Sequence, residues 1–160
     1  LSKGEGLDIL ANIIEELSRL DKKIMFWVVG DGPLRPLAMK LEKTFPQTVR
    51  FFGWRSYKEI PNFVNSADLC IVPRPQTSFS KYCNEEGVQK ISEYMLFRKP
   101  IVACGVAPSK EYLLVKKQDM VKGILEALEG KTPRPTPKTW EDDCKEKVLE
   151  VIKFAMKFNK

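Results

Sequence analysis

The sequence predicts an α/β fold in which a parallel sheet carries helices on both faces. Short apolar runs alternate along the chain with segments in which apolar residues recur at helical spacing. Apolar runs without polar alternation are typical of strands that are buried on both faces, as in parallel sheets. Because the connections are short, successive strands must be parallel and joined by helices. With 160 residues, the chain has room for one domain with a real core.

The elements are expected in a regular order, strands where apolar residues are continuous and helices where they share one face. Gly and Pro mark the ends of several elements, as at Lys99-Pro100. We expect strands at 23–29, 49–53, 67–73, 101–103 and 112–115, and helices at 4–20, 35–45, 60–64, 88–98 and 119–128.

Three segments are expected along the chain. Residues 1–130 form the α/β domain, and residues 131–139 form a connector that is extended because prolines alternate with other residues in it. Residues 140–160 have apolar side chains on one side of a predicted helix, which packs back on the sheet or across to another domain. The first residues, Leu1-Ser2-Lys3-Gly4, resemble the end of a strand entering a helix, so we expect further sequence upstream.

Composition and charge exclude several classes of function. The net charge of +6 is spread among many acidic residues, and no basic run interleaves with aromatic residues, so no nucleic-acid partner is expected. The chain contains no His, which removes Ser-His and Cys-His mechanisms. A zinc site would need all four cysteines, whose spacing is unpaired, so we expect no metal and reduced thiols at Cys70, Cys83, Cys104 and Cys144.

No apolar run is long enough to cross a bilayer, and no signal peptide is recognisable. The sequence therefore predicts a cytoplasmic protein without a transmembrane segment. Any peripheral attachment to a membrane would depend on a further domain.

The stretch 84–103 predicts a ligand site. A polar loop ends at Gly87 and leads into a helix whose first free N–H groups fall near Val88 and Gln89. Free N–H groups and the helix dipole together favour an anion there. Glu85 and Glu93 flank this position, and carboxylates are good acceptors for vicinal hydroxyls. The pattern therefore predicts a ligand with a phosphate in the middle and polyols at both ends, which is the composition of a nucleotide sugar.

Other candidate residues follow the expected strands at their carboxyl ends, where ligands bind in open α/β sheets. Lys3 and Gly4 precede the first helix, Gly30 and Gly32 follow a strand, and Arg55 follows another. Glycines allow a ligand to approach the backbone. For the neighbouring Trp54 and Tyr57, stacking on a base and ordinary packing are equally compatible with the sequence.

Several motifs, taken in order and at their spacing, resemble a known family. They are Lys3-Gly4, VVGDGP at 28–33, VRFFG at 49–53, SADLCIVP at 66–73, and E-x7-E followed by YM and KPIVA. Over residues 1 to about 128 they resemble the carboxy-terminal domain of retaining GT-B glycosyltransferases, the glycosyl transferases group 1. The resemblance implies a Rossmann-like domain that binds a nucleotide-sugar donor and a missing amino-terminal domain that binds the acceptor. It implies retention at the anomeric carbon and neither a metal nor a cofactor.

The resemblance also implies roles for single residues. Lys3 corresponds to a basic residue that pairs with the donor diphosphate, Glu93 to the glutamate that binds ribose, and Glu85 to the glutamate that touches the donor sugar. Arg55 lies in the loop that meets the base. Lys90 is either a phosphate contact or a surface lysine. In the family, an arginine precedes the lysine that corresponds to Lys3, and its position would fall before Leu1.

The motif at Glu85-Glu86-Gly87-Val88 departs from the family pattern of glutamate, any residue, Phe-Gly. The sequence therefore leaves open whether Glu85, Glu86 or Asn84 meets the sugar.

Two alternatives belong to other classes. A nucleotide-sugar epimerase half would share the architecture, although a chain without His supplies few titratable groups. The other is a non-catalytic nucleotide-binding or scaffold module, for instance a receiver-like domain, which would need an acidic cluster and a phosphorylatable Asp at a strand end. Asp31 and Asp68 do not form such a cluster.

Overall fold

A computed structural model describes residues 1–20, 22–137, 139, 145, 148–150 and 152 of the chain. Strands and helices alternate through most of this part, as the sequence predicts. The main elements are α1 (Leu7–Ser18), β1 (Phe26–Val29), α2 (Arg35–Thr44), β2 (Val49–Gly53), α3 (Ile60–Ser66), β3 (Cys70–Pro73), α4 (Gln89–Leu96), β4 (Ile101–Cys104), β5 (Leu113–Leu114) and α5 (Met120–Leu128). Short 3-10 turns η1 (Lys3–Glu5), η2 (Ser80–Tyr82) and η3 (Lys117–Asp119) complete them.

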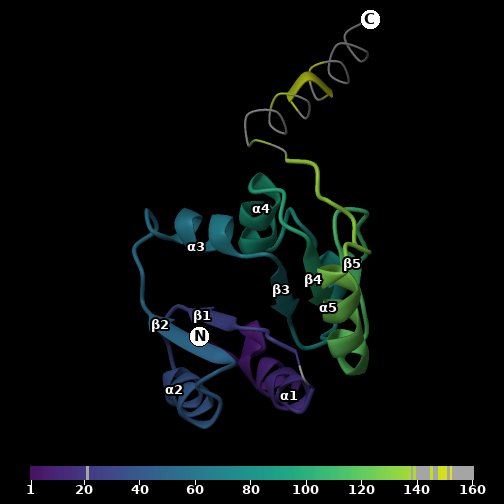
Figure 1. The fold of residues 1–160 in the computed structure, drawn as a ribbon. Helices are drawn as coiled ribbons and strands as arrows, with labels where there is room; N and C mark the ends of the chain where they lie inside the picture. The colour runs from purple at the N-terminus through teal and green to yellow at the C-terminus, as the bar shows by residue number, and fades with distance from the viewer. Residues whose placement is uncertain (21, 138, 140–144, 146–147, 151, 153–160) are drawn as a thin grey trace, which may run out of the picture.

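All paired strands are parallel, which confirms the predicted fold class. The described strands form two sheets rather than one: β1 pairs with β2, and the second sheet has the order β3-β4-β5. Figure 1 shows the two sheets in the middle of the molecule, with β1 and β2 below β3, β4 and β5. Among the strands that the structure describes, β1 and β3 each have a partner on one side only.

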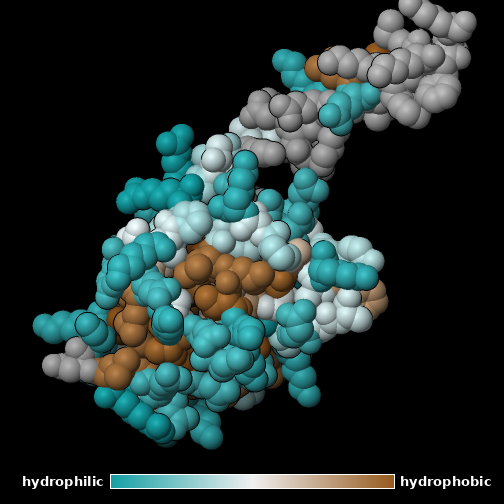
Figure 2. Space-filling view, turned by 90° about the vertical axis from the view of Figure 1, so that its right-hand side faces the viewer, coloured by the Kyte–Doolittle hydropathy of each residue, from teal (hydrophilic) through white to brown (hydrophobic). Residues whose placement is uncertain are grey.

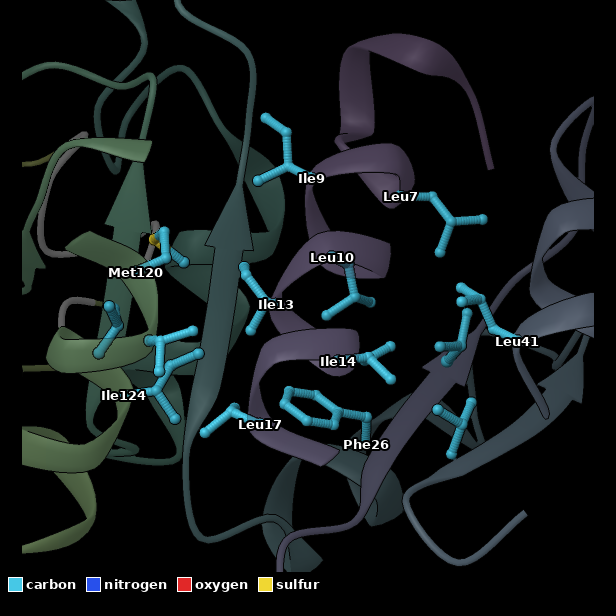
Figure 3. Packing of buried hydrophobic residues seen from close by; sticks show 14 of the residues in the cluster. Leu7, Ile9, Leu10, Ile13, Ile14, Leu17, Phe26, Leu41, Met120 and Ile124 are labelled. Atoms are coloured by element: carbon cyan, nitrogen blue, oxygen red, sulfur yellow. The ribbon is translucent and has the colours of Figure 1, made fainter. Parts of the chain in front are cut away.

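Helices cover both faces of the strands, as predicted. On one face, α1, α2 and α5 bury their apolar sides, and α1 lies between the two sheets, flanked by Phe26 of β1 and by Met120 and Ile124 of α5 (Figure 3). On the other face, α3 and α4 pack with Val64, Ile91 and Met95 against β3 and β4. Successive side chains of β4 point to opposite faces, so this strand is buried on both. Figure 2 shows a continuous hydrophobic area on the surface of the body, bordered by hydrophilic side chains.

Several elements are shorter than the sequence predicts. The helix expected at 4–20 begins at Leu7, because Gly6 has φ 76° and separates α1 from the turn η1. The strands expected at 23–29 and 67–73 begin at Phe26 and Cys70, where their ladders begin. The strand expected at 112–115 has two residues.

The residues before α1 cross from one sheet to the other. The Leu1 carbonyl accepts a hydrogen bond from the Leu34 N–H at 3.1 Å, beside the end of β1. Gly6 lies against the end of β3, where an added Cβ would be 1.6 Å from the Pro73 carbonyl oxygen. Close backbone approach and a positive φ therefore both require glycine at this position.

The predicted connector has neither helix nor strand in its described residues, 131–137 and 139. Two of its backbone N–H groups are bonded to the body: that of Lys131 donates to the Glu126 carbonyl at 3.0 Å, and that of Thr136 donates to Oε2 of the buried Glu111 at 2.7 Å. The prediction of a helix at 140–160 falls mostly outside the described residues. Those that are described there, at 145, 148–150 and 152, are helical and exposed. Among all described residues, no helix has the length and apolar character to cross a membrane.

We expect the Gly6→Ala variant to be strongly destabilised, because Ala would need both a left-handed backbone and a displacement of Pro73. Gly130 is the matched control, since it has a similar φ of 79° and no atom within 4 Å of an added Cβ. Urea unfolding should give a loss of about 1 to 2 kcal/mol for Gly130→Ala and about 3 kcal/mol or more for Gly6→Ala. Equal losses would show that the approach to Pro73 is not tight.

Candidate functional site

The candidate site is built around an ion pair that joins the start of the chain to α4. Nζ of Lys90 donates to Oε2 of Glu5, and both side chains are about one-third exposed. Glu5 ends the turn η1, which also contains Lys3 and Gly4. Two segments that the sequence separates by 85 residues are thereby held together at the carboxyl end of β3.

The surroundings of Glu5 favour its charged form. Partial burial works against ionisation, but the hydrogen bond and the charge of Lys90, together with the charge of Arg74, outweigh it and lower the pKa of Glu5 below the ordinary value of 4.5. Lys90 and Arg74 therefore both place positive charge close to the Glu5 carboxylate. Lys3 is exposed two residues before Glu5.

The first turn of α4 lies next to Lys90. Val88 is the N-cap residue, and its N–H donates to the Asn84 carbonyl at 2.9 Å. The N–H groups of Gln89 and Lys90 belong to the first turn, which has no intrahelical acceptors for them. Glu93 lies one turn further, and its Oε1 accepts a hydrogen bond from Nε2 of Gln89 at 2.9 Å. This half-buried carboxylate is thus oriented along the same side of the helix as the first turn.

Glu85 precedes α4 in the sequence, and both its side chain and its carbonyl accept hydrogen bonds. Its Oε1 accepts a hydrogen bond from Oγ of Ser109 at 3.0 Å, and its carbonyl accepts one from the Ser92 hydroxyl. Its Oε2 is buried and has no hydrogen-bond partner within the described part of the chain. Buried carboxylate oxygens are almost always paired, so an unpaired one is a candidate for contact with a ligand. Burial, and the nearby Glu85 carboxylate, raise the pKa of Tyr112 to about 12.

The three residues that the sequence leaves open for the sugar have different surroundings in the structure. Oδ1 of Asn84 accepts hydrogen bonds from the N–H groups of Glu86 and Gly87, at 3.1 and 3.3 Å, so this side chain closes its own loop. Glu86 is exposed, whereas Glu85 carries the buried, unpartnered oxygen. Which of the three meets the sugar stays a prediction.

Gly30 and Gly32 have φ values of 127° and 145° at the end of β1. The atoms closest to an added Cβ at Gly32 belong to the Leu1 backbone, at 2.6 Å, and those closest to one at Gly30 belong to the Leu1 side chain. In this structure the close approach that these glycines permit is made by the chain itself. Their contact with a donor stays a prediction.

Arg55 follows β2 and is held by its own loop. Its Nε lies 3.8 Å from Oε1 of Glu59, and one guanidinium nitrogen donates to the Trp54 carbonyl at 3.0 Å. Trp54 and Tyr57 are 68% and 71% exposed, so neither is an ordinary packing residue. Their exposure is compatible with stacking on a flat ligand.

Sequence reasoning missed three residues that the fold brings to the site. Glu5 and Arg74 have no local pattern that indicates their pairing, because their partners lie on other elements. Ser109 lies 24 residues from Glu85 and follows no motif. Only tertiary packing places these residues, so no signal in a single sequence could have found them.

Three cysteines are free thiols, as predicted, while Cys144 lies outside the described residues. Burial raises the pKa of Cys70 to about 12 and that of Cys104 to about 11, so neither is a ready nucleophile. Within the described ranges, no group of three or more His, Cys, Asp or Glu side chains could hold a metal ion.

Comparison with known proteins gives a family model and individual relatives. Residues 1–130 match a family model described as glycosyl transferases group 1. The chain is similar to the alpha-D-kanosaminyltransferase of Streptomyces kanamyceticus, with 31% identity over 101 residues, 62% of this chain and 24% of that protein. The chain thus spans about a quarter of the length of this relative.

Solved structures share the fold at low sequence identity. A TarM mutant of S. aureus, in complex with Fondaparinux, alpha-GlcNAc-glycerol and UDP, matches with a TM-score of 0.63 and 16% identity over 80% of this chain and 27% of that chain. Anabaena HepE in complex with UDP-glucose matches with a TM-score of 0.58 and 21% identity over 81% of this chain and 37% of that chain. These likenesses confirm the α/β fold of the GT-B type.

We expect the Glu5–Lys90 pair to stabilise the fold only above acidic pH. Because the pKa of Glu5 in the folded chain is below 4.5, its contribution is present above pH 4.5 and is lost as the pH falls through the folded value. Glu5→Gln should therefore lower the free energy of unfolding near neutral pH by about 1 kcal/mol or less, since solvent screens the pair. The difference from the parent should shrink towards pH 3.

Urea unfolding at several pH values measures this difference. Glu15→Gln is the control, because it removes an exposed pair with Arg19 within α1. A constant difference between Glu5→Gln and the parent at all pH values would contradict the expectation.

Proposed function

Because the chain belongs to the glycosyl transferases group 1 family, we propose that it is the donor-binding part of a retaining glycosyltransferase. The longer protein would transfer a sugar from a nucleotide diphosphate sugar to an acceptor held by an amino-terminal domain. The chain spans 24% to 37% of the relatives described above, which supports a division of labour between this part and another. The donor is a substrate, and we expect no cofactor or metal.

One observation carries this proposal: the pairing of Glu5 with Lys90 brings η1 and the first turn of α4 into one site. The site then contains two lysines, Lys3 and Lys90, and the free N–H groups of a helix start. This combination suits a diphosphate, since charged donors and a helix amino terminus both stabilise phosphate oxygens. Lys90, for which the sequence left a surface role open, is the better placed of the two lysines.

Two glutamates precede and follow this anion position in the sequence. Glu93, oriented by Gln89, is available to accept hydrogen bonds from ribose hydroxyls. Glu85, with one oxygen fixed by Ser109 and the other unpartnered within the described residues, is available to the sugar. Arg55 and the exposed Trp54 lie after β2, where a base could stack. UDP or UDP-glucose is bound in the two solved structures named above, which makes uridine nucleotides the first choice for testing.

In the proposed reaction, the bond between the anomeric carbon and the diphosphate oxygen breaks, and its electron pair stays on the diphosphate. The acceptor oxygen forms a bond to the anomeric carbon on the same face of the sugar, and its proton passes to an oxygen of the leaving diphosphate. Lys90, Lys3 and the start of α4 would stabilise the negative charge that develops on the leaving diphosphate. This part of the protein would therefore supply binding and leaving-group stabilisation, while the acceptor site lies elsewhere.

We expect the chain to bind UDP, and Lys90→Ala to weaken binding by about 10-fold or more, because a charged hydrogen bond to phosphate is lost. Glu93→Ala should weaken binding of UDP to a similar extent through the ribose. Calorimetric titration with UDP, GDP and ADP measures both effects and identifies the base. The control is Lys122→Ala, which removes an exposed lysine paired with Glu126 on α5. Binding of none of these nucleotides, or unchanged binding by both variants, would contradict the proposal.

Glu85 should matter for the sugar and not for the nucleotide. In the full-length protein, we expect Glu85→Gln to lower the rate of UDP release from UDP-glucose by about 100-fold, while UDP binding changes by less than about 2-fold. Glu86→Gln is the matched control on the neighbouring exposed residue. A loss of rate in Glu86→Gln instead of Glu85→Gln would reverse the two roles.

A further inference from the structure

The Glu5 carboxylate lies beside the lysine that is proposed above to hold the donor diphosphate. Nζ of Lys90, in the first turn of α4, donates a hydrogen bond to Oε2 of Glu5. The positive charge of Arg74 acts on the same carboxylate. Cationic side chains and a helix start are also the groups that bind phosphate oxygens. In this structure, an anion of the protein itself is therefore bound at the proposed phosphate position.

A buried side chain of α4 relates Glu5 to the proposed ribose position as well. Burial raises the pKa of Tyr94, and negative charge on Cys70, Glu93 and Glu5 raises it further. One phenol group is thus within electrostatic reach of both Glu5 and Glu93. Glu5 therefore belongs to the same group of charges as Lys90 and Glu93.

Glu5 and a diphosphate cannot both be held at Lys90. The side chains of Lys90 and Glu5 are 30% and 36% exposed, so solvent screens charges at this point only in part. Two anions within a few ångström of each other repel strongly under such conditions. Either the carboxylate or the diphosphate can therefore be bound to Nζ of Lys90, but not both.

The contact between Glu5 and Lys90 can open by rotation of the Glu5 side chain alone. Its backbone is held, because the N–H groups of Glu5 and Gly6 donate to the carbonyls of Ser2 and Lys3 at 3.1 and 3.2 Å. Gly6 is further fixed by its close approach to the Pro73 carbonyl. The turn η1 therefore keeps its position when the partly exposed carboxylate turns to solvent.

We propose that Glu5 is an internal competitor of the donor diphosphate, so that its carboxylate and the diphosphate alternate at Lys90. The identity of the competing anion rests on the proposed function. Glu5 pairs with Lys90 in the closed form of the site and turns to solvent when the donor enters. After transfer, its return to Lys90 favours release of the nucleotide diphosphate. Glu5 thereby sets the affinity of the site for both substrate and product.

The test is a calorimetric titration of the parent, Glu5→Gln, Lys90→Ala and the double variant with inorganic pyrophosphate and with UDP. We expect Glu5→Gln to bind both probes about 5-fold more tightly, because a partly exposed ion pair keeps most molecules in the closed form. In the Lys90→Ala background the same substitution should give no gain, because Glu5 acts through Lys90. The matched control is Glu15→Gln, which removes the same charge from an exposed pair with Arg19 on α1 and should not change binding.

Two results would overturn the proposal. Unchanged or weaker binding of pyrophosphate by Glu5→Gln would show that Glu5 positions Lys90 and does not compete with the anion. An equal gain with and without Lys90, or in Glu15→Gln, would show that only the net charge matters.

The two probes separate this inference from the proposed function. Tighter binding of pyrophosphate by Glu5→Gln, without binding of UDP by any form, would support the competition and contradict the nucleotide-binding role. Equal binding of UDP by the parent and Glu5→Gln would contradict the competition and leave the nucleotide-binding role intact. Binding of neither probe by any form would overturn both.

Discussion

The structure depends on one backbone crossing, at which Gly6 passes the carbonyl oxygen of Pro73. The positive φ of Gly6 turns the chain out of η1 and into α1, and the contact fixes this turn at the end of β3. From there, α1 buries one face against both sheets, and Glu5 comes within reach of Lys90. The packing of the core and the assembly of the candidate site thus both depend on the path of residues 1–6.

The sequence predicts the fold well where burial decides it. Ile101 to Cys104 is an uninterrupted apolar run and forms a strand buried on both faces, and Ile91 and Met95 form the buried side of α4. The break at Gly6 and the division into two sheets could not be predicted from periodicity. Both follow from contacts between segments distant in sequence, such as Gly6 with Pro73, which leave no repeat in the local pattern.

The candidate site was predicted in part for the same reason. Residues on α4, such as Lys90 and Glu93, follow from the helix start and its spacing, which are local features. The carboxylate that faces Lys90 and the hydroxyl of Ser109 that holds Glu85 come from other elements. The sequence therefore predicts an anion position at the start of α4, whereas the fold shows which side chains from other elements are bonded to the groups around it.

Lys90 connects these observations physically. A lysine next to a helix start, with no nearby acid, would repel the positive end of the helix dipole. Glu5 compensates the charge of Lys90, and the hydrogen bond and charge of Lys90 lower the pKa of Glu5 despite its partial burial. Under the proposed function, an incoming diphosphate would have to take the place of the Glu5 carboxylate beside Lys90, because two anions at one position repel each other. The Glu5–Lys90 pair therefore makes the position of Lys90 depend on the path of the chain before Gly6.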